Sequence, residues 1–212
     1  MKRQMKRISI TIVGITISHL GAAGAACVNI GQGPVSAFCL AVCEWTGIQF
    51  GTVLIFFQYA FLAGQILLLR RSFPLNKLMQ LLTVALGGLL VNFFLNFIFT
   101  GFEIVYYPAR VLTGTLFYLL NAAGVSLVLM TNLIGVPLES FLSILSERTT
   151  MPLGALKRIV DCGLILLSVL LCLICHLDFT IREGTLINAL VFGGMLEFMK
   201  APTRRLKEKL AI

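Results

Sequence analysis

Charge is what this sequence lacks most. Only 12% of its 212 residues are charged, whereas 58% are hydrophobic and the mean hydropathy is +0.96. A soluble domain of this length cannot bury so much apolar surface, but the hydrocarbon core of a bilayer accepts it. The apolar runs are continuous rather than alternating, which argues against a transmembrane β-barrel. The sequence therefore predicts an all-α polytopic membrane protein.

Motifs of soluble enzymes are also missing. The sequence has no Ser-His-Asp set, Walker loop or dinucleotide fingerprint, so we do not expect an enzyme. The run "CLICH" at 172–176 has the spacing of c-type haem attachment, but it ends an apolar span. It offers no evident second axial ligand for haem and no convincing fourth ligand for zinc. We expect no cofactor and no metal, and we interpret the six cysteines as buried thiols without a disulfide framework.

The few charges that are present are strongly segregated. The net charge is +8, and every lysine and arginine except Arg110 and Arg182 falls in one of four clusters. The clusters are Lys2, Arg3, Lys6 and Arg7; Arg70, Arg71 and Lys77; Arg148, Lys157 and Arg158; and Lys200, Arg204, Arg205, Lys207 and Lys209. Six spans with both termini in the cytoplasm place every cluster inside, as the positive-inside rule requires. The basicity therefore indicates topology, and the expected partner is the lipid bilayer rather than nucleic acid.

Six apolar stretches are long enough, or nearly so, to cross about 30 Å of hydrocarbon at about 1.5 Å per residue. They are residues 8–28, 48–69, 76–99, 110–131, 155–176 and 184–200. Two shorter segments, 34–46 and 137–149, begin with proline, which the first turn of a helix tolerates. They predict two half-length helices, either re-entrant or interfacial. The amphipathic stripe of 137–149 fits an interfacial helix, while 34–46 is apolar all round and favours burial.

The two halves of the chain resemble each other at an offset of 103 residues. The pairs are Gly21 and Gly124, Asn29 and Asn132, Pro34 and Pro137, Phe38 and Phe141, Glu44 and Glu147, Thr46 and Thr149, and Gly51 and Gly154. Each half holds three spans, so the second copy must be inverted relative to the first. The sequence thus predicts a single membrane domain, 1–212, with repeat 1 at about 8–99, repeat 2 at about 110–200 and a cytoplasmic basic tail at 201–212.

Both half-helices follow irregular segments, Gly-Gln-Gly before Pro34 and Leu-Ile-Gly-Val before Pro137. Irregular backbone at membrane depth is tolerated only against protein or a water-filled cavity. The helix starts carry unpaired N–H groups and the positive ends of their dipoles, which suit an anionic or strongly polar group. We therefore predict a substrate site where the two breaks meet.

The few polar and ionisable residues near the breaks and within the spans complete this predicted site. Asp161 lies two turns inside its span with Lys157 and Arg158 one turn before it, and its repeat partner is Gln58. Neutralisation of a charge at the cytoplasmic edge is an equal alternative for that pair, and backbone capping is an alternative for the two asparagines. The candidate substrate-binding residues are Asn29, Gly33, Pro34, Ser36, Gln58, Asn132, Pro137, Glu139, Arg158 and Asp161. His19 is interpreted as a packed, hydrogen-bonded residue.

Three segments resemble the YczE/YyaS/YitT family of bacterial integral membrane proteins over nearly the whole chain. They are "GPVSAFCLAVCEWTGIQFGT" from Gly33, "GVPLESFLSILSERTTMPLGALKRIVD" from Gly135 and "EGTLINALVFGG" from Glu183. The resemblance implies six spans in a bacterial cytoplasmic (inner) membrane, with the family's second-half acid at Glu139 and its helix pair at Arg158 or Lys157 with Asp161. Where the family has further acids, this chain has Ser36 and Asn92.

Together these features predict a small secondary transporter or permease for a small polar or anionic metabolite, bound at the repeat interface. Two alternatives remain open: a substrate-binding membrane subunit of a larger importer, and a membrane regulatory or interaction protein that transports nothing. The small-residue runs "GAAGAA" and "ALGGLL" would allow close helix packing within the chain or in a homodimer.

Overall fold

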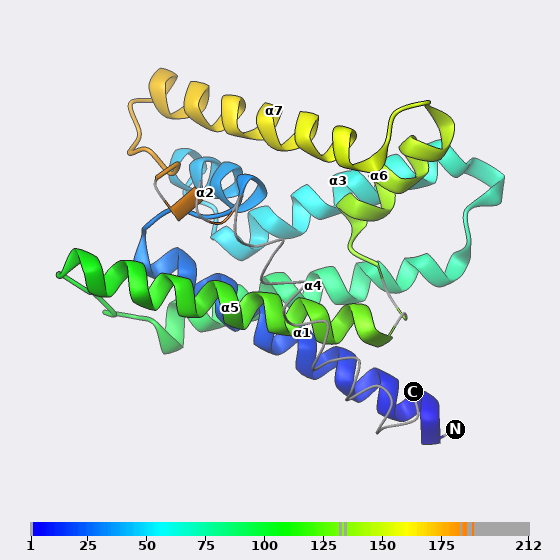
Figure 1. Cartoon of the computed structure of the whole chain (residues 1–212), viewed down its shortest axis with the longest axis horizontal. Helices are drawn as coiled ribbons and strands as arrows, with labels where there is room; N and C mark the ends of the chain where they lie inside the picture. Colours follow the sequence, from blue (N-terminus) through cyan, green and yellow to red (C-terminus); the bar gives the residue numbers. More distant parts are fainter. Residues whose placement is uncertain (1, 132, 134, 183, 186–187, 189–212) are drawn as a thin grey trace.

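The computed structural model describes residues 2–131, 133, 135–182, 184–185 and 188. Within these residues the chain is helical and contains no strand. The helices are α1 (Lys2–Val28), α2 (Pro34–Thr46), α3 (Phe50–Leu69), α4 (Met79–Phe93), α5 (Tyr107–Thr131), α6 (Pro137–Arg148) and α7 (Leu153–Ile174), with short 3₁₀ turns η1 (Arg70–Ser72) and η2 (Leu75–Leu78) and a π-helical turn η3 (Phe94–Ile98). Figure 1 shows their order along the chain.

Proline, glycine and asparagine set the helix boundaries. Asn29 ends α1 with a φ of 55°, a left-handed conformation that asparagine adopts more readily than most residues. Pro34 and Pro137 each occupy the first turn of their helix. Gly47 closes α2 with a φ of 71°, and its N–H donates to the carbonyl oxygen of Cys43. The two half-length helices predicted from the sequence therefore form as separate helices.

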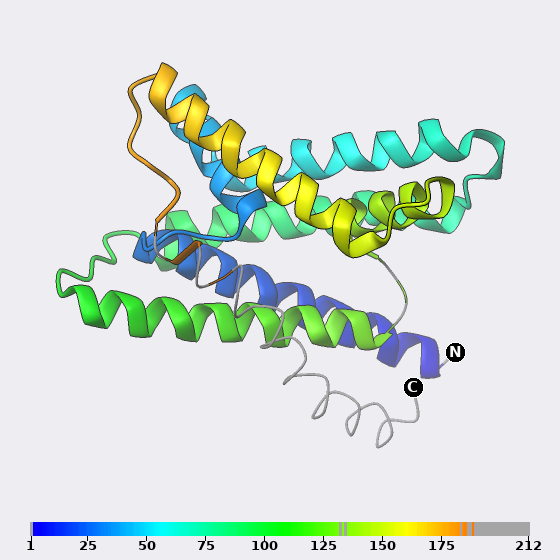
Figure 2. The same ribbon diagram turned by 45° about the horizontal axis from the view of Figure 1, so that its top comes forward.

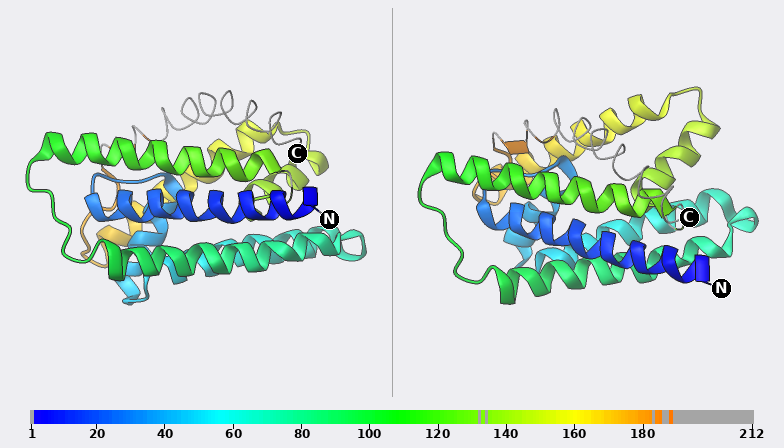
Figure 3. Two further views of the ribbon diagram at one scale, coloured as in Figure 1. Left: turned by 90° about the horizontal axis from the view of Figure 1, so that it is seen from below. Right: turned by 60° about the horizontal axis from the view of Figure 1, so that its bottom comes forward.

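The helices pack in two layers, which Figure 2 shows from the side. One layer contains α1, α4 and α5; α1 packs against both neighbours and lies between them in Figure 3. The other contains α2, α3, α6 and α7. Here α2 packs against α3 and α7, and α6 packs against the same two helices. The short helices α2 and α6 lie towards opposite ends of the molecule (Figure 1).

Glycines bring α1 and α5 into close contact. A Cβ added at Gly21 would lie 2.7 Å from the carbonyl oxygen of Phe117, and one added at Gly124 would lie 2.6 Å from that of Gly14. Both distances are far below ordinary contact, so neither position accepts a side chain. Gly21 and Gly124 are 103 positions apart, and so are the residues they contact, Gly14 and Phe117. The two contacts are therefore related as the two halves of a two-fold contact would be. The small residues of "GAAGAA" thus serve packing within the chain.

The outer surface of the bundle is apolar. Large hydrophobic side chains that are more than half exposed occur on α3, α4, η3, α5 and α7, among them Phe56, Leu67, Leu82, Leu89, Phe97, Leu112, Leu116, Leu166 and Ile174. A soluble monomer rarely exposes so much apolar surface, whereas a bilayer covers it. The predicted class, an all-helical membrane protein, is confirmed.

Four helical stretches in the described residues are long and apolar enough to cross a bilayer: Gln4–Val28, Phe50–Ser72, Met79–Ile98 and Tyr107–Thr131. They correspond to the first four predicted spans. The fifth predicted span is α7, which has 22 residues but carries Lys157, Arg158 and Asp161 in its first half. The sixth, 184–200, falls almost entirely outside the described residues.

The six cysteines are all free thiols, and the sequence predicted no disulfide framework. Their burial differs from the prediction at one position, because Cys162 is exposed on α7 while Cys39 and Cys172 are buried. The Cys172 thiol donates a hydrogen bond to the carbonyl oxygen of Asp178, at 3.3 Å. Cys162 precedes Gly163, where an added Cβ would meet nothing within 4 Å.

Candidate functional site

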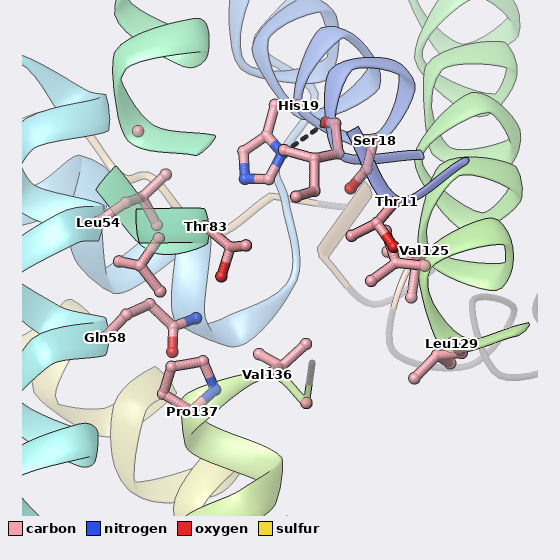
Figure 4. Close-up of a pocket in the computed structure, with 15 residues that line it drawn as sticks. Thr11, Ser18, His19, Leu54, Gln58, Thr83, Val125, Leu129, Val136 and Pro137 are labelled. Carbon is pink, nitrogen blue, oxygen red and sulfur yellow. Dashed lines mark hydrogen bonds between the residues drawn. The ribbon is translucent and has the colours of Figure 1, made fainter. Parts of the chain in front are cut away.

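A cavity of about 150 Å³ lies at the centre of the bundle, between the two layers. Five segments that are distant in the sequence surround it, and Figure 4 shows their side chains. The lining residues are Thr11, Ile15, Ser18 and His19 of α1; Leu54 and Gln58 of α3; Thr83, Val84 and Gly88 of α4; Val125, Val128 and Leu129 of α5; and Gly135, Val136 and Pro137 at the start of α6. The start of α6, at one of the two predicted breaks, therefore forms part of the cavity wall.

Glycines on α4 make room for the cavity walls. A Cβ at Gly87 would lie 2.7 Å from Cε1 of the His19 ring, so the imidazole packs directly on the α4 backbone. Gly88 faces Gly51 of α3 closely enough that a Cβ on either residue would clash with the carbonyl oxygen of the other. The "ALGGLL" run thus serves helix contacts within the chain.

His19 presents one ring nitrogen to its own helix. Its Nδ1 lies 2.7 Å from the carbonyl oxygen of Ile15, and a carbonyl can only accept, so Nδ1 carries the proton. In the neutral imidazole Nε2 is then an acceptor. The ring lines the cavity, as Figure 4 shows. His19 is packed and hydrogen-bonded, as the sequence predicted, but it also contributes a polar edge to the cavity.

Gln58 supplies the second polar wall. It projects from α3 beside Pro137 (Figure 4), and its Oε1 is buried without a hydrogen-bond partner in the described part of the chain. A buried amide oxygen that accepts nothing costs about 1–3 kcal/mol, so such a group calls for a partner. Of the nine predicted site residues that the structure describes, Gln58 and Pro137 line the cavity.

Hydroxyl groups contribute the remaining polarity. The Oγ1 atoms of Thr11 and Thr131 are 2.9 Å apart, and Thr11 also donates to the carbonyl oxygen of Arg7. Thr83 donates to carbonyl oxygens of its own helix, at 3.2 and 3.3 Å. No charged side chain lines the cavity among the residues that the structure describes. Its walls are mainly apolar, with neutral polar groups on opposite sides.

A buried amide network holds the start of α6 in place. Gln65 of α3 is fully buried, and its Nε2 donates to the carbonyl oxygen of Pro137 at 3.0 Å and to Oε1 of Gln80 at 3.3 Å. Gln80 in turn donates to the hydroxyl of Ser140, at 3.3 Å. A backbone carbonyl and a side-chain hydroxyl at the start of α6 thus find partners on α3 and α4, which fixes the wall formed by Pro137.

The start of α2 is also held, but it is filled by side chains. Tyr118 of α5 is buried, and its hydroxyl donates to the carbonyl oxygen of Gly31. Gly31 has a φ of 101°, and an added Cβ would lie 2.7 Å from the hydroxyl oxygen of Thr185. Ser168 of α7, also fully buried, approaches the carbonyl oxygen of Ala37 at 3.4 Å. The chain thus fills the space around this break itself.

The predicted residues of the first break accordingly lie away from the cavity. Asn29 is exposed, and its carbonyl oxygen accepts a hydrogen bond from Arg182 at 3.2 Å. Gly33 precedes α2, and a Cβ there would lie 3.1 Å from the side-chain oxygen of Asn188. Pro34 and Ser36 lie in the first turn of α2, half-buried. Asn132, the partner of Asn29, lies outside the described residues.

The predicted charged residues form a separate group on α6 and α7. Nζ of Lys157 lies 3.2 Å from Asp161 and 3.9 Å from Glu139, so one lysine joins two carboxylates. The ion pair that the sequence left open between two basic residues is made by Lys157. Arg158 is exposed and has no such contact among the described residues. We call Glu139, Lys157 and Asp161 the charged triad; none of its members lines the cavity.

Asn92, which stands where the resembled family has an acid, has a structural role. Its Oδ1 accepts a hydrogen bond from the N–H of Gly51 at 2.7 Å, and its Nδ2 donates to the hydroxyl of Thr52 at 2.9 Å. It thereby satisfies a backbone donor in the first turn of α3. The sequence signal that could have found the cavity residues is the presence of a histidine in one apolar span and a glutamine in another.

The fold and the cavity together define a class: an all-helical membrane protein with a small cavity between its helices, lined by neutral side chains among the described residues. The chain belongs to a family of unknown function, DUF6198, whose model matches residues 5–201. No curated protein and no solved structure matches it significantly.

Proposed function

We propose that the protein is a small secondary transporter or permease, and that the central cavity binds its substrate. The observation that carries this proposal is the presence of two polar side chains, His19 and Gln58, on the walls of a cavity in a strongly apolar bundle. Polar groups inside a membrane bundle are costly, and they are retained mainly where they serve a ligand or a pathway. The interrupted chain before α6 forms one wall, as broken helices do in many transporters.

An inverted repeat with six spans is part of the same proposal. Nδ2 of Asn121 donates to the carbonyl oxygen of Ser18 at 3.2 Å, and these two residues are themselves 103 positions apart. Gln65 and Ser168 are a further pair at this offset, and each donates to a first-turn carbonyl of the other half's short helix. Such exchanged contacts support a two-fold relation between the halves, on which alternating access could operate.

The orientation and the wider resemblance complete the proposal. Cytoplasmic termini in a bacterial inner membrane follow from the positive-inside pattern and from the resemblance to the YczE/YyaS/YitT family, and the substrate would be a small polar metabolite. The charged triad would then lie near the cytoplasmic end of α7, outside the binding cavity.

An uptake experiment tests transport without a known substrate. Proteoliposomes of the full chain are incubated with a defined mixture of small metabolites, washed, and their contents identified by mass spectrometry. At least one metabolite should enter faster than in protein-free liposomes. Val84→Phe, which fills the cavity, should abolish the difference, whereas the same change at Val105, which is 90% exposed, should not. Equal contents with and without protein would reject transport.

A further inference from the structure

We propose that the cavity selects an uncharged ligand of about six non-hydrogen atoms, which donates a hydrogen bond to His19 and accepts one from Gln58. This inference rests on the proposed function and names the class of its substrate. The size follows from the volume, because an apolar cavity of about 150 Å³ in another protein accommodates benzene. A small aliphatic primary amide or alcohol has this size and can both donate and accept.

The neutral lining of the cavity argues against an ion as the preferred ligand. No acidic or basic side chain of the described part of the chain lines the walls. An ion that leaves water for an apolar site needs a partner of opposite charge, and an uncompensated one costs several kcal/mol. The nearest candidates on α6 and α7 are the members of the charged triad, which pair with one another.

The start of α6 does not provide a vacant anion site either. Pro137 has no N–H, and the N–H of Ser140 already donates to the carbonyl oxygen of Val136 at 2.9 Å. The carboxylate of Glu139 accepts a hydrogen bond from its own backbone N–H. The chain's own acid therefore occupies the positive end of this helix dipole, where an anionic ligand would otherwise bind.

The two polar walls determine which groups the ligand must carry. With Nδ1 of His19 donating to Ile15, Nε2 can only accept in the neutral ring. Gln58 turns its NH₂ group towards the open space in Figure 4 and its unpartnered Oε1 towards Pro137, so it offers the cavity a donor. A primary amide matches both, since it has two donors and one acceptor. The apolar residues Leu54, Val84 and Val128 would enclose its hydrocarbon part.

The test compares three probes of the same branched carbon skeleton: isobutyramide, isobutyrate and isobutylamine. Binding to the detergent-solubilised full chain is measured by ligand-observed NMR and calorimetry. Isobutyramide should bind at least tenfold more tightly than either ion. Gln58→Met should weaken amide binding at least tenfold, whereas Gln49→Met, at an exposed position before α3, should leave it unchanged.

Folding is controlled by thermal unfolding of each variant. If Gln58→Met does not fold, Val84→Phe is used to occupy the cavity, and it should remove amide binding. Tighter binding of isobutyrate or isobutylamine, unchanged affinity in these variants, or no binding of the amide would each overturn the proposed ligand class. Transport is decided independently by the uptake experiment. Failure of the proposed ligand class and failure of the transport function are therefore distinguishable.

Discussion

The two short helices, α2 and α6, begin alike but lie in different surroundings. Each starts with a proline after an irregular segment, each packs against both α3 and α7, and each has a first-turn carbonyl that accepts a hydrogen bond from a fully buried side chain. The start of α6 lines the central cavity, whereas no residue of α2 does. The shared features are those that the backbone needs, since an interrupted helix inside a bilayer must satisfy its polar groups.

The difference comes from side chains at matched positions. Tyr118 fills the space beside the first break, whereas its partner at the 103-residue offset, Ile15, leaves the cavity beside the second. On the adjoining helices, the cavity residues Leu54 and Gln58 of α3 correspond to Lys157 and Asp161 of α7. Matched positions in the two halves therefore line a cavity in one half and form ion pairs in the other.

The largest expected effect concerns the framework that both halves share. Gly124→Leu should abolish the folded protein, because even a Cβ at this position overlaps the backbone of α1. Gly163→Leu is the matched control, since a Cβ there meets nothing within 4 Å. Fluorescence-detected size-exclusion chromatography in detergent should show a monodisperse peak for the Gly163 variant alone. A normal peak for the Gly124 variant would refute the close α1–α5 contact.

Tyr118→Ala should make the first break resemble the second. Removing a buried aromatic ring costs about 3–5 kcal/mol and leaves a cavity beside Gly31. Tyr118→Phe, which removes only the hydroxyl, should cost about 1 kcal/mol. Both are measured as shifts of the thermal unfolding midpoint, and the alanine variant should gain a second site for a small apolar molecule such as benzene. Equal midpoints for the two variants would show that the ring does not fill this space.

The side chains that hold the two helix starts should differ in importance. Gln65→Met should lower the free energy of unfolding by about 1–3 kcal/mol, because the carbonyl oxygen of Pro137 and Oε1 of Gln80 lose a buried donor. Ser168→Ala should cost about 1 kcal/mol, since its contact to Ala37 is longer, at 3.4 Å. Urea titration of both variants gives the comparison, and a larger loss for the serine variant would reverse the ranking.

Much of the fold could be predicted from the sequence because its signals are local. Long apolar runs predict spans, Pro34 and Pro137 predict helix starts, and the repeated glycines predict close helix contacts. The charges of α7 were correctly placed inside its first half, although the sequence did not decide between Lys157 and Arg158 as the partner of Asp161.

The cavity could be predicted only in part, because its walls come from five separate segments. Pro137 and Gln58 carried a local signal, one as a break and the other as a polar residue in an apolar span. Thr11, Ser18 and Thr83 carried none, since hydroxyl residues in helices commonly bond their own backbone. The sequence predicted a symmetric pocket between Pro34 and Pro137. Tyr118 fills the space beside the first break, and the repeat pattern alone does not reveal this role.

The smallest expected effect tests the charged side of the comparison. Lys157→Gln should lower stability by about 1 kcal/mol or less, because the triad is partly exposed and such pairs contribute little. Arg158→Gln removes the same charge one residue along, without a carboxylate partner, and should cost less still. High salt should narrow the difference in stability between the Lys157 variant and the wild type, as expected for screened charges.

Ligand binding provides a second comparison of these two variants. Since no member of the triad lines the cavity, isobutyramide should bind the two variants equally. A loss of binding in Lys157→Gln alone would mean that the charged half of the molecule acts on the neutral half, and the two sides could no longer be treated as independent.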